Sequence, residues 1–489
     1  DTLSVTATIP FDAQYGTGEA YVYLAPGRTT ITQPVVVVEG FDLDDTMNWD
    51  ELYALLNDEG LVESLRADGY DAVVLNFADA TDYMQRNAFV LVALIEQVQA
   101  MLPAQARFAL VGASMGGLVG RYALAYMETN AIAHRVSLFM TFDSPHAGAN
   151  IPLGIQYWLD FFSGESADAA FLLSRLDTPA ARQMLVYHHT TPPSGSPSAD
   201  PLRAVFAADL ATVGGYPSQP RRVAVANGSA TMQNQGFAAG DQIIAWEYNT
   251  FLVDITGNVW AVPDGGSTRI FEGLIWVFLI QNESLDVTVS GTLPYDNAPG
   301  GSRASMADMD SVAAPYGDIV ALHERHCFIP TVSALDLATS DLFYDIAGDP
   351  NLLALTPFDA VFFPVGNEPH VDITPENAAW ILGEIEGMPT AVRAVEAPAA
   401  RLAQNHPNPF NPQTAIRFAL PGAARVTLAV YDARGRHVAT LFDDHAGPGE
   451  HIVRWDGRGQ TRASAPSGVY FCRLVTPWGT LTRKMVLLR

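Results

Sequence analysis

The stretch Phe108-Ala109-Leu110-Val111-Gly112-Ala113-Ser114-Met115-Gly116-Gly117 decides the fold of this chain. Its first half is a short apolar run that predicts a strand, and Tyr122, Ala123 and Tyr126 continue a helix after it. Between the two lies Gly-x-Ser-x-Gly. A sharp strand-to-helix turn forces such a serine into a strained conformation with its hydroxyl exposed, and it needs small residues two positions before and after. Ser114 is therefore the candidate nucleophile.

The segments on either side of this turn alternate between strand and helix patterns. Residues 1–34 alternate apolar and polar side chains, as antiparallel strands do. After them, β-branched and apolar runs predict buried strands, and helical spacing predicts the connections. The strands are expected at 35–38, 72–77, 108–111 and 136–142, and the helices at 49–65 and 89–102. This order predicts an α/β fold, a mostly parallel sheet with helices on both faces.

The later part of the chain adds two insertions and a second domain. The alternation of strand and helix patterns stops over 145–220, which we interpret as a lid-like insertion. The pattern of 240–300 predicts an antiparallel β insertion. A last strand is expected at 358–363, before a helix that Thr374 caps. The predicted domains are thus a catalytic domain over 1–387, an Ala/Pro-rich linker over 388–404, and a small all-β, immunoglobulin-like sandwich over 405–489.

Charge divides the chain at the same place. The 489 residues have a formal net charge of -26. Residues 391–489 hold 13 Lys and Arg against 6 Asp and Glu, a net of +7, which leaves -33 for residues 1–390. Such an acidic body would repel a phosphate backbone, so nucleic acid is not an expected partner.

Cysteine usage and hydropathy exclude further classes of protein. Cys327 and Cys472 are the only cysteines, so a disulfide framework and a Cys-type metal cluster are excluded, and two buried thiols are expected. No apolar run reaches the length of a membrane span. The chain opens at Asp1 without a basic-then-apolar leader, so we expect a signal peptide to have been removed. Asp42, Asp44 and Asp45 are favoured as helix-capping residues over a Ca²⁺ site, and no metal is predicted.

Together these motifs resemble the lipase and esterase branch of the α/β-hydrolase fold, over roughly residues 30–387. Val38-Glu39-Gly40-Phe41-Asp42 stands where lipases carry His-Gly-Phe or a similar turn, with Glu39 in place of the histidine. The segment 142–148, Phe-Asp-Ser-Pro-His-Ala-Gly, is similar to the Thr-Pro-His-x-Gly turn of many bacterial lipases. The resemblance implies an oxyanion hole made by the backbone N–H groups of Phe41 and Met115.

A serine hydroxyl needs a general base, and the resemblance implies a histidine after the last strand of the sheet. His370, in Asn367-Glu368-Pro369-His370-Val371, occupies that place. His326 is the main competitor, because it lies beside the loop at 328–331. His146 is expected to brace its own turn.

The acid of the triad has three candidates. Lipases similar to lecithin:cholesterol acyltransferase carry it in a Gly-Asp-Gly-Thr-Val-Pro loop, but the nearest match here, at 326–330, has no aspartate. Asp143 ranks first, because its place at the end of a strand fixes it near Ser114. Asp296, which lies late in the long segment before the last strand, ranks second, and Asp336 ranks third.

Within the first insertion, Trp158, Leu159, Phe161 and Phe162 form an amphipathic stretch. It is expected to lie over the serine as a lid and to offer an apolar surface to acyl chains. A core helix is the alternative interpretation.

The C-terminal module resembles the type A sorting domain of the type IX secretion system, related to the immunoglobulin-like domain of flagellar hook-capping proteins. The resemblance rests on Asn405-His406-Pro407-Asn408-Pro409-Phe410-Asn411-Pro412 and on Trp455-Asp456-Gly457, Ser467-Gly468-Val469-Tyr470-Phe471 and Lys484-Met485-Val486-Leu487. It implies export from a bacterium, with release or surface attachment, and the secretion machinery as a partner.

The sequence thus predicts a secreted serine ester hydrolase, a lipase or carboxylesterase, that acts through a Ser-His-Asp triad and an acyl-enzyme without a cofactor. Its expected substrate is an ester with an apolar acyl part, such as a lipid or a polyester. The alternatives are an extracellular polyesterase or acyltransferase on the same machinery, and a non-catalytic surface adhesin on a hydrolase fold.

Overall fold

The computed structural model divides the chain into two compact units, Asp1–Ala391 and Val392–Arg489. The residues that it describes are 1–42, 53–54, 56–190, 196–312, 314, 316–388, 400–405, 407–420, 423–447, 449–461, 463–477 and 479–488. Asp44 and Asp45, the start of the helix expected at 49–65 and most of the predicted linker lie outside these ranges.

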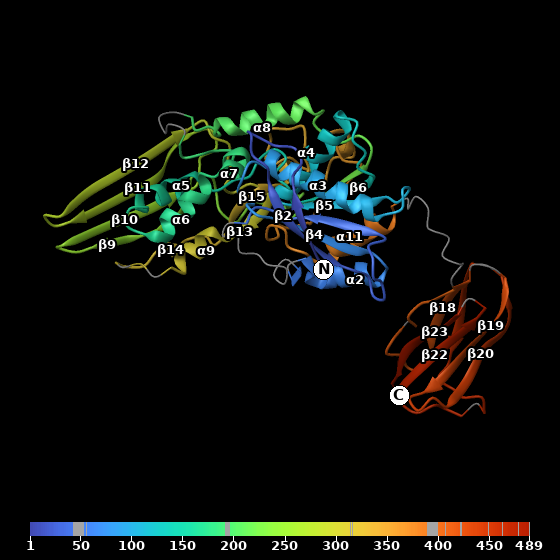
Figure 1. The fold of residues 1–489 in the computed structure, drawn as a ribbon. Helices are drawn as coiled ribbons and strands as arrows, with labels where there is room; N and C mark the ends of the chain where they lie inside the picture. Colours follow the sequence, from blue (N-terminus) through green and yellow to red (C-terminus); the bar gives the residue numbers. More distant parts are fainter. Residues whose placement is uncertain are drawn as a thin grey trace. The chain divides into compact units, whose positions relative to one another are not determined.

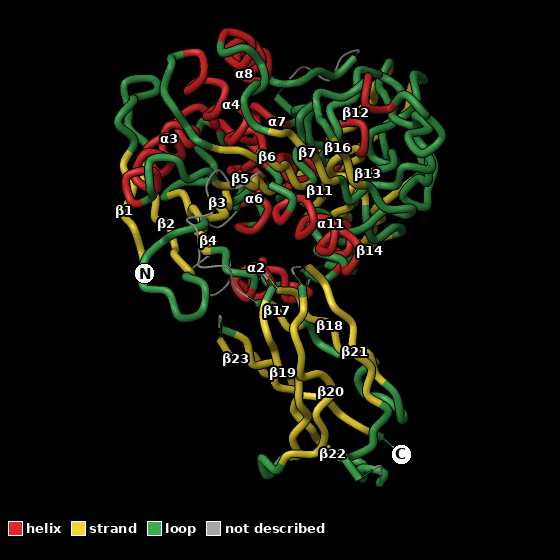
Figure 2. The backbone as a smooth tube through the Cα atoms, turned by 90° about the vertical axis from the view of Figure 1, so that its right-hand side faces the viewer, coloured by secondary structure: helices red, strands yellow, loops and turns green. Residues whose placement is uncertain are grey.

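The first unit is built around an eight-stranded sheet (Figures 1 and 2). From β3 to the far edge every neighbouring pair is parallel, whereas β2 runs antiparallel to both of its neighbours. In sheet order the strands are β1 (Thr2–Thr6), β2 (Thr17–Tyr23), β4 (Asp71–Phe77), β3 (Pro34–Val38), β5 (Phe108–Ala113), β6 (Val136–Phe142), β7 (Arg221–Val225) and β16 (Ala360–Phe362).

Helices cover both faces of this sheet, which is why its central strands are apolar throughout. On β3, Val36 and Val38 face the core formed with α3 (Met84–Met101) and α4 (Met115–Thr129). Val35 and Val37 face a second core, under α2 (Leu61–Ala67) and α11 (Pro375–Glu386). This strand order, with helices on both faces, is the α/β-hydrolase fold, so the predicted fold class is confirmed.

One predicted helix is interrupted. In place of a continuous helix up to residue 65, the described part has a 3-10 turn, η1 (Asp58–Gly60), before α2. Glu59 and Gly60 have positive φ angles of 54° and 69°, which a right-handed helix cannot accommodate. The described part of this segment is therefore divided into two short elements, η1 and α2, although its apolar spacing predicted one helix.

Two long segments interrupt the order of the main sheet. Between β6 and β7 the described residues form α5 (Leu153–Phe162), α6 (Ala167–Leu176), α7 (Pro179–Met184) and α8 (Pro201–Thr212). Between β7 and β16 lies a six-stranded antiparallel sheet of β8 (Gln242–Ala245), β9 (Glu247–Asn249), β10 (Val253–Trp260), β11 (Ser267–Val277), β12 (Gln281–Ser290) and β14 (Val320–Ala321).

Strands β9 to β12 form two hairpins that project away from α3 and α4 (Figure 1), and we call them the β arm. A smaller pair, β13 (Gly300–Arg303) and β15 (His326–Pro330), follows the arm and is hydrogen-bonded to the loop that carries His370. Short helices α9 (Ser305–Asp310) and α10 (Thr331–Ala334) flank this pair.

The second unit is an all-β sandwich (Figure 2). Its core is shared by both sheets and contains Trp455, Tyr470 and Phe418, whereas Tyr431 is only partly buried. One sheet comprises β17 (Arg401–Leu402), β18 (Thr414–Leu420) and β21 (Gly449–Trp455), and the other comprises β20 (His437–Ala446), β19 (Ala424–Asp432), β22 (Gly468–Thr476) and β23 (Gly479–Leu487).

Cys327 and Cys472 are buried free thiols, as predicted from their number. Among the described helices, none has the length and apolar character needed to cross a membrane.

Asp71, the first residue of β4, fastens the chain that precedes β3 to the sheet. Its buried carboxylate accepts hydrogen bonds from the backbone N–H groups of Ala25, at 2.9 Å, Thr32, at 2.7 Å, and Gln33, at 3.0 Å. Burial by itself would raise the pKa of Asp71, but these hydrogen bonds and the nearby Arg28 outweigh it and hold the pKa below its usual value.

Replacing Asp71 by Ala removes the acceptor of three backbone donors and lowers the free energy of unfolding by about 3 kcal/mol at pH 7. Because the folded-state pKa is lowered, the carboxylate stabilises the fold fully above the ordinary Asp pKa and loses this effect as the pH falls through the lowered value. Urea unfolding at pH 7 and at acidic pH measures both effects. Asp68→Ala, an exposed neighbour, is the control, and equal losses for the two variants would contradict the assignment.

Candidate active site

Ser114 lies at the turn where β5 ends and α4 begins. Its φ of 52° and ψ of -125° are strained for a residue with a side chain, as the motif predicts. A β carbon on Gly112 would lie 2.4 Å from the carbonyl oxygen of Gly116, and one on Gly116 would lie 2.4 Å from the carbonyl oxygen of Val38. Only glycine fits at these two positions, so the sequence of the turn is dictated by backbone contacts.

His370 and Asp143 meet Ser114 in one line of hydrogen bonds. The Ser114 hydroxyl lies 2.8 Å from His370 Nε2, and His370 Nδ1 lies 2.6 Å from Asp143 Oδ2. An ionised carboxylate only accepts, so Nδ1–H donates to Asp143 and Nε2 is left to accept from the hydroxyl. The structure therefore joins the first-ranked base and acid to the predicted nucleophile across 256 and 227 residues of sequence.

Asp143 is held in place from several sides. It follows β6 directly, is fully buried and has a positive φ of 45°. Its second carboxylate oxygen accepts the backbone N–H of Asn227 at 3.0 Å. A β carbon on Gly301 would lie 2.0 Å from Asp143 Oδ2, so β13 must present a glycine here. These contacts fix the carboxylate against His370.

The loop that carries His370 is fastened to β13. The backbone N–H of His370 donates to the Ser302 carbonyl at 2.8 Å, and Ser302 N–H donates to the Glu368 carbonyl at 2.9 Å. The ring of Phe328, on β15, packs edge-on against the imidazole with centroids 4.8 Å apart. The β13–β15 pair thus orients the histidine, although neither strand was singled out in the sequence for this purpose.

The predicted oxyanion-hole segment lies beside Ser114. A β carbon on Gly40 would lie 2.9 Å from Ser114 Cβ, and Phe41 lines the same cavity as Ser114. Met115 is the first residue of α4, so its N–H belongs to the helix N-terminus, which favours negative charge. Glu39, which replaces the histidine of similar lipases, is buried and accepts the Phe77 N–H, and so fastens the turn to β4.

A cavity of about 260 Å³ opens beside the Ser114 hydroxyl. Helices α5, α6 and α7 supply one side of its apolar wall, through side chains such as Ile155, Leu159, Leu176 and Met184, and loops and the β13–β15 region supply further apolar side chains. The wall is therefore suited to a hydrocarbon chain.

Of the four side chains expected in a lid, only Leu159 lines this cavity. The aromatic residues pack against the six-stranded insertion sheet instead: Trp158 against Trp246, between β8 and β9, at 5.9 Å between ring centroids, Phe162 against Trp246 at 5.0 Å, and Phe161 against Phe271 of β11 at 5.7 Å. Helix α5 is thus a buried wall of the cavity, as in the alternative interpretation of this stretch.

Two cationic side chains, Arg175 and Arg303, also line the cavity, and Arg303 is connected to the histidine through an aromatic ring. The guanidinium of Arg303 lies 5.3 Å from the centroid of the Phe328 ring, which itself packs on His370. Burial lowers the pKa of Arg303 below its usual value.

The structure places the other candidate acids elsewhere. Asp296 is buried, and its two oxygens accept from Asn150 Nδ2 at 3.0 Å and from the Val262 N–H at 2.7 Å. Burial raises its pKa to about 6. Asp336 pairs with Arg121 at 3.2 Å and accepts the Tyr216 hydroxyl at 2.7 Å.

The competing histidines are likewise bonded to other groups. His326 bonds through Nε2 to the Ser305 hydroxyl and through Nδ1 to the Cys327 carbonyl, and burial lowers its pKa to about 4. His146 is buried beside Arg121 and Phe358, and burial lowers its pKa to about 3. Both remain neutral at pH 7.

Asn227 is the residue that sequence reasoning missed. Its backbone supports Asp143, and its side-chain amide donates to the Glu368 carboxylate at 3.0 Å and to the Asp372 carbonyl at 2.9 Å. The signal was available: Asn-Gly-Ser follows β7 at the edge of the sheet where Ser114 and Asp143 also lie. Parallel strands bring such residues together at their carboxyl ends.

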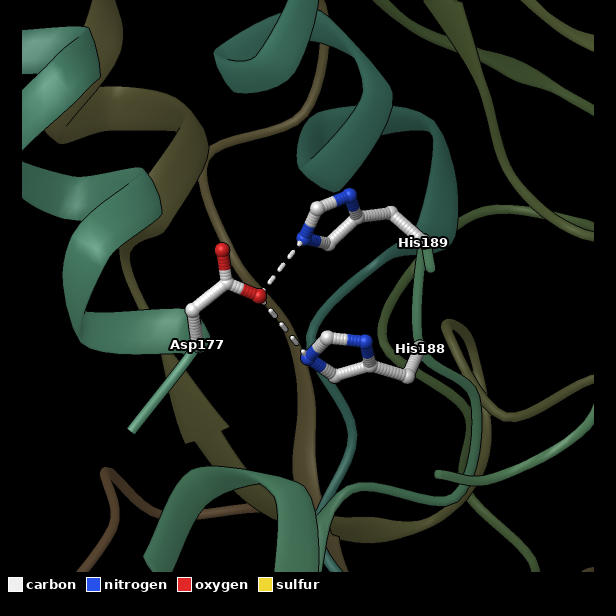
Figure 3. A group of neighbouring side chains, drawn as sticks. All are labelled: Asp177, His188 and His189. Atoms are coloured by element: carbon white, nitrogen blue, oxygen red, sulfur yellow. Dashed lines mark hydrogen bonds and ion pairs between the residues drawn. The ribbon is translucent and has the colours of Figure 1, made fainter. Parts of the chain in front are cut away.

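Within the described ranges, Asp177, His188 and His189 form a cluster whose ligand atoms lie within 4.8 Å of one another (Figure 3). Asp177 Oδ1 already pairs with Arg182 at 3.0 Å, and His188 bonds to the Leu176 carbonyl and the Thr190 hydroxyl. A guanidinium so close repels a cation, so we interpret this cluster as an ion-pair network of the insertion. Asp42 of the acidic cluster is buried, and its companions lie outside the described residues.

Comparison with known proteins gives one family match. A family model described as a PGAP1-like alpha/beta domain matches residues 75–166, a segment that includes Ser114 and Asp143. A search of curated proteins finds no match.

Similarity to solved structures is partial. Est1E from Butyrivibrio proteoclasticus is 15% identical over 29% of this chain, with a TM-score of 0.21, and the match spans 51% of Est1E. A fungal esterase from Rhizomucor miehei is 14% identical over 46% of this chain and 65% of its own, at a TM-score of 0.27. PorZ, a surface component of the type-IX secretion system of Porphyromonas gingivalis, is 22% identical over 18% of this chain and 11% of its own, at 0.14. The function proposed below therefore rests on the geometry of the site and not on these partial matches.

Gly116→Ala is expected to lower kcat/KM for the ester hydrolysis proposed below by at least about 100-fold, because the added carbon collides with β3 and displaces the turn that carries Ser114. Gly383→Ala in α11 is the matched control, since a β carbon there meets no atom within 4 Å. Circular dichroism verifies folding. Full activity in Gly116→Ala would show that the close contact is unnecessary.

Proposed function

We propose that the first unit is a serine ester hydrolase, a lipase or carboxylesterase that works through an acyl-enzyme. The observation that carries this proposal is the hydrogen-bonded line Ser114–His370–Asp143 at the mouth of an apolar cavity. A strained serine, a histidine that accepts its proton and a buried carboxylate behind the histidine are the three groups that acyl transfer requires.

In the first half of the reaction, Ser114 Oγ attacks the ester carbonyl while His370 Nε2 takes the hydroxyl proton. Asp143 holds Nδ1–H and stabilises the imidazolium that forms. The backbone N–H groups of Phe41 and Met115 hold the oxyanion, and the C–O bond then breaks as His370 returns its proton to the leaving alcohol.

In the second half, His370 takes a proton from water, and the resulting hydroxide attacks the acyl carbon. The Ser114–acyl bond breaks, His370 reprotonates Ser114, and a carboxylic acid leaves. The chain's own side chains supply every proton transfer, so no cofactor is required.

The cavity supports an ester with an apolar acyl chain as substrate. Its wall is mainly apolar and includes aliphatic side chains of α5, α6 and α7. Each methylene that moves from water into such a wall gains about 0.8 kcal/mol. A lipid or an aliphatic polyester offers chains of this kind.

Export from the cell, with release or attachment at the surface, is proposed for the second unit. Its support is the density of motifs that resemble a type A sorting domain, together with a compact sandwich that has its own core. The partner would be a bacterial secretion machinery. Cells that produce residues 1–489 behind a signal peptide should show the hydrolase in the medium or exposed on their surface to added protease, and the same protein cut at residue 391 should stay inside the cells.

Ser114→Ala and His370→Ala are expected to lower kcat for p-nitrophenyl esters by roughly 10⁵-fold, and Asp143→Asn by about 10⁴-fold. Asp296→Asn and Asp336→Asn serve as controls and should keep kcat within about tenfold. Labelling with a fluorophosphonate should occur in the wild type and vanish in Ser114→Ala. An unlabelled wild type would contradict the proposed function, and loss of kcat only in Asp296→Asn would contradict the assigned acid.

Chain-length dependence tests the substrate class. From acetate to hexanoate, kcat/KM should rise by roughly fourfold for each methylene that enters the cavity, which corresponds to about 0.8 kcal/mol. Steady-state rates with p-nitrophenyl esters below their critical micelle concentrations provide the measurement. A maximum at acetate would contradict an apolar acyl pocket. Leu159→Asp, within the wall, should abolish the increase.

A further inference from the structure

Large apolar side chains are exposed at the end of the β arm. The turn between β9 and β10 presents Phe251, 82% exposed, and Leu252. The turn between β11 and β12 presents Phe278, Leu279, 89% exposed, and Ile280, 82% exposed. We call these five residues the apolar tip, and the ends of the hairpins that carry them project away from the helices of the unit (Figure 1). Turns exposed to water normally carry small or polar residues, so a cluster of large apolar side chains at two turns is unusual.

The two turns form one continuous surface. The rings of Phe251 and Phe278 stack with centroids 6.3 Å apart, and the backbone N–H of Phe278 donates to the Leu252 carbonyl at 3.0 Å. Leu279 has a positive φ of 58°, a conformation that turns usually assign to Gly or Asn. An aliphatic residue is thus kept at the outermost turn despite backbone strain, and this pattern is typical of functional positions.

The charges around the tip select the kind of surface it can meet. Residues 242–290 contain one basic residue, Arg269, and it pairs with Glu272 and Asp286 at 2.9 and 2.7 Å. The charged residues nearest in sequence to the tip are Asp254 and Glu283, both acidic. An anionic membrane would therefore repel the tip, whereas an electrically neutral apolar layer would not.

The size of the tip favours a lipid layer over a protein partner. A standard protein interface uses about 20–30 residues on each side. Five side chains on two turns fall far short of that. A lipid layer is fluid and needs no complementary shape, so a few aromatic and aliphatic side chains suffice to enter its interfacial region.

The β arm is joined firmly to the proposed active site. Strand β11 packs so closely on α5 that a β carbon on Gly273 would lie 2.8 Å from the Phe161 ring. On the same helix, Ile155 and Leu159 line the cavity beside Ser114. A surface that holds the tip therefore holds the cavity wall in a defined position as well.

We propose that the apolar tip inserts into the surface of an electrically neutral lipid layer and anchors the first unit there. This inference rests on the exposed residues of the β arm and holds whether or not Ser114 is a nucleophile. It assigns the arm the role of an interfacial anchor.

Co-sedimentation of the full chain with phosphatidylcholine vesicles tests the proposal. The wild type should pellet with the vesicles, and the triple variant Phe251→Ser, Leu279→Ser, Ile280→Ser should lose at least tenfold in partition coefficient. Val205→Ser with Leu353→Ser is the control, because these apolar side chains are about half exposed, at 48% and 54%, and lie elsewhere in the unit. The melting temperatures of all three proteins verify folding.

Two further measurements distinguish other possible partners of the apolar tip. Adding phosphatidylglycerol to the vesicles should weaken binding, and binding that requires this anionic lipid would overturn the proposal. A wild type that stays in the supernatant, or a triple variant that pellets like the wild type, would overturn it too. Concentration-dependent dimers that the triple variant lacks, in a protein that ignores vesicles, would assign the tip to a second copy of the chain. Hydrolysis of a water-soluble ester is recorded separately, so failure of either proposal is distinguishable.

Discussion

The close approach of the α4 N-terminus to the end of β3 is the constraint on which the site depends. Gly112 and Gly116 let the backbone of the turn lie against Val38, and this contact pushes Ser114 into its strained conformation. A relaxed turn would direct the hydroxyl away from the sheet edge. The sheet and helices beneath the turn hold it in this conformation. The central strands are buried on both faces and therefore have no room to move.

The remaining groups of the site converge because parallel strands end at one edge of the sheet. Asp143 follows β6, Asn227 follows β7 and His370 follows β16, and each is fixed by bonds to the others or to β13. The carboxylate is fully buried and the imidazole nearly so, with 13% of its side chain exposed. Water is therefore kept from the Asp143–His370 hydrogen bond, and the pair interacts more strongly than it would at the surface.

Sequence patterns predicted the fold well, because continuous apolar strands and the Gly-x-Ser-x-Gly turn reflect local constraints. They predicted Ser114 from local chemistry and His370 from its order along the chain. They ranked Asp143 first from its place at the end of a strand but left Asp296 and Asp336 open, because only tertiary contact shows which aspartate faces the histidine. Helix α5 was misjudged for a similar reason: an amphipathic stretch with Trp158, Phe161 and Phe162 reads alike as a lid or as a core helix, until the six-stranded insertion sheet that covers it is known. The helix expected at 49–65 was wrong where Glu59 and Gly60 adopt positive φ angles, which apolar spacing does not encode.

The central claim is that Ser114 carries the acyl group during turnover. Intact-protein mass spectrometry tests it most directly, on enzyme mixed with p-nitrophenyl butyrate and quenched in acid within the first turnovers, followed by peptide mapping. The account predicts a mass increase of one butyryl group, located on the peptide that contains Ser114, and its disappearance as the substrate is consumed. Turnover without any adduct, or with the adduct on another residue, would contradict it.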